Sequence, residues 1–139
     1  LILDKAVGRF VPPRLLLFIL VGGSGLGVHF LVFGSIFFTG LAGFSTSQLV
    51  ATMVAMTTNY IFNNLITYRE ARKRGWKFAA GLLGFYAVCS IGLIGNVGIA
   101  AYAYDLHYKW WLAAFAGIVV GTVWNYAASS IFVWNRRRI

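Results

Sequence analysis

Amide and hydroxyl side chains lead into clusters of basic residues at two places in this chain, and together they could bind a phosphate. The first place runs from Asn59 to Arg69, and the second runs from Asn125 to Arg136. Spacings of four and seven residues put such side chains on one face of a helix. Arginine pairs with phosphate oxygens through parallel N–H groups, and amides and hydroxyls supply further donors. The sequence therefore predicts a cytoplasmic-side phosphate site, with the candidate residues Asn59, Asn63, Arg69, Arg72, Lys73, Arg74, Asn125, Ser129 and Arg136.

A simpler interpretation of the same residues stays open. Polar side chains in membrane helices often only hydrogen-bond to a neighbouring helix, which is typically worth ~0.6 kcal/mol and at most ~2 kcal/mol. Clusters of Lys and Arg commonly do no more than fix the orientation of a membrane protein. The candidate residues are therefore either a phosphate site or helix contacts followed by charges that set the topology.

Of the Asp, Glu, His, Lys and Arg side chains, only His29 lies far inside an uncharged stretch. Such a residue is by default a functional candidate, but a neutral imidazole that donates a hydrogen bond to Asn96 is the simpler prediction. The sequence shows no nucleophile with a partnered base, no carboxylate pair and no cluster of metal ligands. We therefore expect no catalytic residue, cofactor or metal site in this chain, and we interpret Cys89 as a small core residue.

The basic residues are confined to three short clusters, and Lys109 is the exception. The clusters lie at 5–14, 69–77 and 136–138. Long stretches contain no Asp, Glu, Lys or Arg at all: 15–68, 78–104 and 110–135. Because a helix needs ~20 predominantly apolar residues to cross the hydrocarbon core of a bilayer, this pattern predicts a membrane protein.

Composition excludes the main alternatives. A chain that is 60% hydrophobic and 11% charged has too little polar surface for an ordinary soluble domain. The net charge of +9 does not indicate a nucleic-acid partner, because that requires a basic stripe on a folded surface and these charges flank apolar stretches. They are better suited to anionic lipid headgroups.

The apolar stretches predict an all-α, polytopic membrane domain over 14–139. The stretch 15–68 is too long for one crossing, and Thr39–Ser45 offers a turn near its middle. The patch around Asp105 and Lys109 offers another, flanked by tyrosines and tryptophans that favour the headgroup region. The four predicted transmembrane helices are therefore 15–38, 46–67, 78–103 and 110–134.

An even number of crossings places both termini and the loop 69–77 on the same side of the membrane. Only Lys109 is basic on the other side. Since loops rich in Lys and Arg stay in the cytoplasm, we expect a multi-pass protein with both termini cytoplasmic, in a prokaryotic inner or plasma membrane.

Residues 1–13 predict a short amphipathic helix that lies in the membrane interface. Leu3, Ala6, Val7 and Phe10 share one face, basic residues occupy the other, and two prolines end the segment. The chain starts without a methionine. We therefore expect this segment to be the junction with an upstream portion of a longer protein.

The two halves of the chain resemble each other. A shift of 66 residues aligns Asn59 with Asn125, Asn63 with Ser129 and Tyr68 with Trp134. A basic cluster follows the aromatic residue in both halves. The first and third crossings match more loosely. This predicts two repeated hairpins in parallel orientation, and chance similarity between apolar helices is the alternative.

Three motifs resemble the GtrA-like family of four-crossing membrane proteins: RLLLFILVGGSG at 14–25, NYIFNNLITYR at 59–69 and VWNYAASSIFVW at 123–134. The resemblance covers about 14–136. In that family the domain either stands alone, where it is thought to move polyprenyl-phosphate-linked sugars across the bilayer, or follows a family 2 glycosyltransferase that makes such lipids. The segment 4–14 is similar to the junction in dolichol-phosphate-mannose-synthase-like fusions. His29 departs from the family, because many relatives are expected to carry an acidic residue there.

The resemblance implies a membrane domain in cell-surface polysaccharide or glycoconjugate synthesis. Its implied partners are membrane lipids, a polyprenyl-phosphate sugar and a glycosyltransferase catalytic domain, fused or separate, and a homo-oligomer is compatible with it. The alternatives are a stand-alone translocator of the lipid-linked sugar and a purely structural anchor. A small multidrug-type exporter would need a membrane-embedded carboxylate, which the predicted crossings lack.

Overall fold

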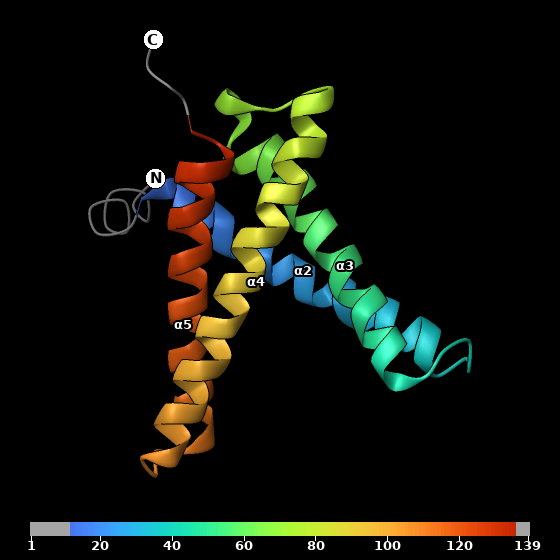
Figure 1. Cartoon of the computed structure of the whole chain (residues 1–139), viewed down its shortest axis with the longest axis vertical. Helices are drawn as coiled ribbons and strands as arrows, with labels where there is room; N and C mark the ends of the chain where they lie inside the picture. The colour runs from blue at the N-terminus through green and yellow to red at the C-terminus, as the bar shows by residue number, and fades with distance from the viewer. Residues whose placement is uncertain (1–11, 136–139) are drawn as a thin grey trace, which may run out of the picture. The chain divides into compact units, whose positions relative to one another are not determined.

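The structure is a computed structural model, and it describes residues 12–135. These residues form helices joined by turns (Figure 1), and the chain divides into two compact units. Unit 1 comprises Leu1–Arg72 and unit 2 comprises Lys73–Ile139. The predicted interfacial helix falls almost entirely in residues 1–11, which lie outside the described part, as does Arg136.

Unit 1 is a helical hairpin. Helix α2 spans Pro13–Phe37 and helix α3 spans Phe44–Phe62. Proline suits the first position of α2, because its missing N–H would have no partner there. The turn between the helices includes Gly40, whose φ is +73°. This turn overlaps the segment that the sequence indicates as a break.

Helix α3 continues into a π-helix, η1, over Asn63–Thr67. The backbone N–H of Tyr68 donates to the carbonyl oxygen of Asn63 at 2.8 Å, which is a wider turn than that of an α-helix. A short 3-10 helix, η2, follows over Arg69–Ala71. The predicted crossing 46–67 therefore corresponds to α3 and η1 together.

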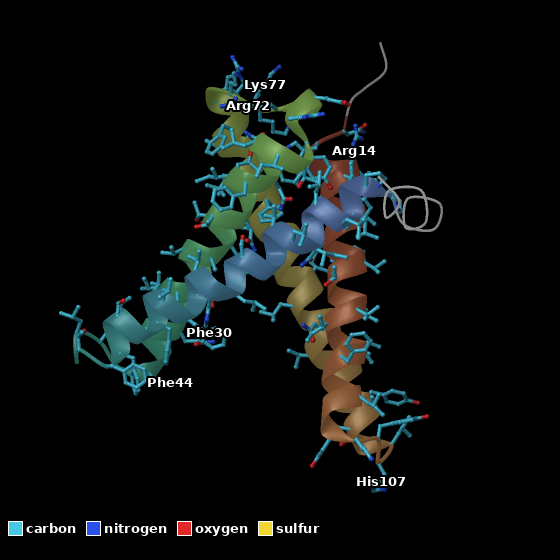
Figure 2. All side chains as sticks on the ribbon, turned by 180° about the vertical axis from the view of Figure 1, so that it is seen from behind. Arg14, Phe30, Phe44, Arg72, Lys77 and His107 are labelled. Atoms are coloured by element: carbon cyan, nitrogen blue, oxygen red, sulfur yellow. The ribbon has the colours of Figure 1, made fainter. Side chains whose placement is uncertain are left out.

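Unit 2 is a second hairpin in which, as in unit 1, two α-helices are followed by a π-helix. Helix α4 spans Trp76–Asp105, helix α5 spans Trp110–Ala128, and the π-helix η3 spans Ser129–Val133. Figure 1 shows α4 and α5 running side by side in opposite directions. They are joined by a turn in which His107 has a φ of +64°, and Figure 2 labels His107 at that end.

Small side chains form the contact within each hairpin. On α3 they recur every fourth residue as Ser47, Ala51 and Ala55, all buried. On α5 the same spacing brings Ala113, Gly117 and Gly121 to buried positions. Small residues let two helix backbones approach closely, which favours packing where lipid removes the hydrophobic driving force.

Larger buried side chains come mainly from the first helix of each hairpin and from the end of the second. In unit 1 they are Phe18, Val21, Tyr60 and Tyr68, and in unit 2 they are Phe85, Val88, Cys89, Val133 and Trp134. The rings of Phe85 and Trp134 meet edge to face, with centroids 5.7 Å apart. The burial of Cys89 confirms its interpretation as a core residue.

Three helical stretches in the described part are long and apolar enough to cross a membrane: Pro13–Phe37, Trp76–Asp105 and Phe115–Val133. They correspond to the first, third and fourth predicted crossings. Helix α3 is not one of them, because Ser, Thr, Gln and Asn lower its hydropathy. The all-α class is confirmed, and the count of four crossings stays a prediction.

Candidate phosphate site at the basic end of unit 1

Buried polar side chains occupy the end of the unit 1 hairpin. Asn63, Asn64 and Thr67 of η1 are only 1%, 2% and 4% exposed. The Thr67 hydroxyl donates to Oδ1 of Asn63 at 2.7 Å, so this oxygen is satisfied within the π-helix. The predicted site residue Asn63 therefore lies in the packed part of the unit.

Asn59 lies against α2 at Gly25. A Cβ atom built on Gly25 would overlap Oδ1 of Asn59, so the amide fills the space that a larger residue would need. This oxygen is buried, and within the described part of the chain it has no hydrogen-bond partner of the N–H or O–H kind. Because the glycine Cα–H bond takes the direction of the missing Cβ, it points toward this oxygen and supplies a weak donor.

Asn125 makes the corresponding contact in unit 2. Its Oδ1 occupies the space that a Cβ on Gly92 would need, and it too is buried without a hydrogen bond to any described residue. Ser129 is fully buried, and its hydroxyl likewise makes no hydrogen bond to any described residue. The contacts of Asn59 and Asn125 suit the interpretation of these amides as links between helices of one hairpin.

The basic side chains of unit 1 lie where the polar residues end. Arg69 and Arg72 are exposed, and Arg14, in the first turn of α2, reaches the same end. Figure 2 labels Arg14 and Arg72 at the end of unit 1 that is remote from Phe44. Together with Glu70, these arginines are called the basic end of unit 1. Three guanidinium groups against one carboxylate leave it positively charged, which favours anions.

An ion pair joins two members of this basic end. Nη2 of Arg14 donates to Oε2 of Glu70 at 2.8 Å, and the two side chains are 55% and 53% exposed. The contact connects residues at the beginning and the end of the hairpin. Neither residue was among the candidates that the sequence indicated, because two charges 56 positions apart show no relation in a linear pattern.

The remaining basic candidates belong to unit 2. Lys73 is half-buried and Arg74 is exposed, directly before helix α4. Their sharing of one site with the residues of unit 1 stays a prediction.

His29 and Asn96 lie in different units. The imidazole of His29 stacks on Phe33, with ring centroids 6.3 Å apart, and meets Phe30 edge to face at 5.6 Å. The Cβ atom of Asn96 lies beside Gly121, 3.1 Å from where a Cβ on that glycine would be. Each residue thus has neighbours within its own hairpin, and the hydrogen bond between them stays a prediction.

Sequence patterns missed three further features. The indole N–H of Trp124 donates to the backbone carbonyl of Val88 at 3.1 Å and so ties α5 to α4. Both second helices also end in π-helices, for which the residue types give no signal. The close contact of α3 with α2 lies at Gly25, which faces Asn59. A Cβ atom on Gly23 or Gly27 would have nothing within 4 Å.

In residues 12–135 no group of three or more His, Cys, Asp or Glu side chains is placed to hold a metal ion. The guanidinium groups at the basic end of unit 1 are donors of the kind that pair with anions.

Comparison with protein families decides the class of protein. Residues 17–134 match the family described as GtrA/DPMS, transmembrane domain. The chain belongs to this family. Membership implies a role in handling polyprenyl-phosphate sugars and a multi-pass membrane protein. The match covers both hairpins, including the polar ends of α3 and α5. No curated protein was found to match the chain.

Proposed function

We propose that this chain is a membrane domain that anchors a family 2 glycosyltransferase, fused or separate, and holds the phosphate of its polyprenyl-linked sugar at the basic end of unit 1. The observation that carries the proposal is the family match over 17–134. Arg14, Arg69 and Arg72 support it, because they leave a net positive charge beside a hairpin whose apolar surface suits an isoprenoid tail.

In this proposal α3 crosses the membrane as the second of four helices. With η1 it runs continuously over 44–67, long enough at ~1.5 Å per residue to cover a ~30 Å hydrocarbon core. Two of its hydroxyls donate to backbone carbonyls of the same helix. Thr57 donates to the carbonyl of Met53 at 2.7 Å, and Thr58 to that of Val54 at 2.9 Å. Such bonds lower the cost of placing these side chains in lipid.

We also propose that the two hairpins are repeats. The buried residues Ser47, Ala51 and Ala55 precede Ala113, Gly117 and Gly121 by the same 66 positions that separate Asn59 from Asn125 and the two π-helices. Chance similarity between apolar helices accounts for shared composition, but it gives no reason for a shared π-helix at the same register. Duplication of one hairpin accounts for both.

Lipid binding tests the phosphate site. The full chain is placed in nanodiscs of phosphatidylcholine, and native mass spectrometry measures its occupancy by a long-chain polyprenyl monophosphate. The Arg69→Gln, Arg72→Gln double variant is expected to lose most of the bound lipid. Lys109→Gln, which neutralises a charge at the turn before α5, serves as the control and is expected to bind normally. Equal binding by all three proteins would show that the basic end of unit 1 is not the site.

The fusion is tested by the coding sequence before Leu1. A metal-dependent glycosyltransferase domain encoded there would support the anchoring role. A start codon immediately before Leu1 would leave a separate glycosyltransferase as the partner.

The matching architecture of the hairpins favours a second candidate, translocation of the lipid-linked sugar, since several transporters are built from internal repeats. Liposomes that contain the chain would then move a polyprenyl-phosphate sugar between leaflets faster than protein-free liposomes. Equal rates would leave the anchoring and holding role alone.

A further inference from the structure

The ion pair between Arg14 and Glu70 occupies one of the three arginines at the basic end of unit 1. Within the described residues, Arg69 and Arg72 make no ion pair, so Arg14 differs from them in already holding a carboxylate at 2.8 Å. The sequence has only three acidic residues, Asp4, Glu70 and Asp105. One of these few carboxylates thus lies among the arginines.

The position of Arg14 in its helix is unfavourable for a positive charge. It lies in the first turn of α2, and the N-terminal end of a helix disfavours cations. That turn contains no acidic residue and no side-chain cap. Glu70 follows the second helix of the hairpin in the sequence, lies at the same end of the unit, and supplies the missing negative charge.

A phosphate could readily replace the Glu70 carboxylate in this ion pair. Both side chains are more than half exposed, and ion pairs of this kind contribute little because water solvates each partner well. A phosphate presents the same acceptor geometry to a guanidinium, and it carries one negative charge as the diester of a sugar-linked lipid and up to two as a monoester. With Arg69 and Arg72 nearby in the chain, it gains more from this end of the unit than one carboxylate does.

We propose that Glu70 is an internal competitor of the lipid phosphate: it holds Arg14 while the basic end of unit 1 is empty, and a phosphate displaces it. This inference rests on the proposed phosphate site. Once displaced, the Glu70 carboxylate lies close to the bound phosphate and repels it. Glu70 therefore limits affinity and favours release of the lipid, as a domain that passes on a product requires.

Single variants with opposite expected effects test this competition. Polyprenyl monophosphate binding is titrated on the full chain in phosphatidylcholine nanodiscs. Glu70→Gln is expected to tighten binding about two- to fivefold, the range given by an exposed ion pair. Arg14→Gln is expected to weaken binding by a similar factor. If the ion pair were only a structural link, both variants would loosen the hairpin and shift binding in the same direction, which would overturn the competition.

Two further variants isolate the mechanism. Asp105→Asn removes a carboxylate at the far end of α4 and is expected to leave binding unchanged, so equal tightening by this variant would reduce the effect of Glu70→Gln to net charge and overturn the proposal. In the Arg14→Gln background, Glu70→Gln is expected to tighten lipid binding much less than it does in the wild-type background. A full gain in that background would show that Glu70 does not act through Arg14.

The same titration with phosphatidylglycerol and with inorganic phosphate identifies the ligand. Opposite shifts for polyprenyl monophosphate alone would support the competition with the isoprenoid lipid as ligand. The same shifts for all three would support it with phosphate in general as ligand. The outcome is separable from the proposed function: if wild-type protein and the Arg69→Gln, Arg72→Gln variant bind equally, the phosphate site itself fails, whereas a site that binds but shows parallel shifts refutes only the competition.

Discussion

At the scale of single residues, the two glycine–asparagine contacts explain how polar side chains are accommodated inside the hairpins. Gly25 receives Asn59 and Gly92 receives Asn125, each at a place where a Cβ atom would overlap the amide oxygen. The sequence indicated both asparagines and left helix contacts open as their role, but it did not indicate the residues that they contact. Their partners follow from the helix crossing, which decides which glycine among several is approached.

Gly92→Ala is expected to destabilise unit 2 by about 1–3 kcal/mol, because the added methyl group overlaps the Asn125 amide and forces the helices apart. Thermal unfolding in detergent, followed by circular dichroism, measures the loss. Gly95→Ala is the matched control, since a Cβ there meets nothing within 4 Å, and it is expected to be neutral or slightly stabilising. Equal losses for both variants would contradict the contact.

The hydrogen bond from Trp124 to Val88 leads to a second expectation. Trp124→Phe keeps an aromatic ring but removes the indole N–H that donates to the Val88 carbonyl, so a loss of about 0.5–1.5 kcal/mol is expected in the same unfolding measurement. Trp76→Phe, at an exposed tryptophan at the start of α4, is the control and is expected to change stability by no more than about 0.5 kcal/mol.

At the scale of helices, close approach depends on small residues at every fourth position of α3 and α5. In α5 the spacing of Gly117 and Gly121 is itself a pattern typical of close helix packing. The equivalent residues of α3 carry no such signal, because serine and alanine at such spacing are common in helices that pack less closely. The π-helices were also unforeseen, since a wider turn depends on the contacts at the end of the hairpin and not on residue type.

Ala51→Leu tests the small-residue contact of unit 1. Ala51 is completely buried, so the larger side chain is expected to separate α2 from α3 and lower stability by about 1–3 kcal/mol. Met53→Leu changes a half-exposed position of the same helix and is expected to have little effect. Resistance of the two proteins to limited proteolysis in detergent compares them directly. Similar protection of both would show that Ala51 is not at the contact.

At the scale of the whole molecule, the distribution of charge leads to a topology. Three helical stretches of the described part are apolar enough to cross a membrane, and the proposed crossing by α3 would return the chain to the side on which it started. The clusters around Arg14 and Arg72 and the isolated Lys109 then lie on opposite sides, with the clusters cytoplasmic.

Cysteine labelling in a Cys89→Ala background tests this topology. A cysteine at Arg74 is expected to react with a membrane-impermeant maleimide only after the cells are permeabilised, whereas cysteines at Gly40 and Lys109 are expected to react in intact cells. Labelling of positions 40 and 74 under the same condition would mean that α3 does not cross. Swapped labelling of all three would mean that the orientation is reversed.

The sequence by itself determined the class of protein, the approximate ends of the helices and the polar ends of α3 and α5, because each depends on composition and on spacing along one helix. Long uncharged stretches identify spans regardless of how they pack, and residues four apart share a face in any helix. The tertiary structure decided which side chains meet: Asn59 with Gly25, Trp124 with Val88 and Arg14 with Glu70. These pairs join separate helices, so they depend on crossing angle and register, which no single helix contains.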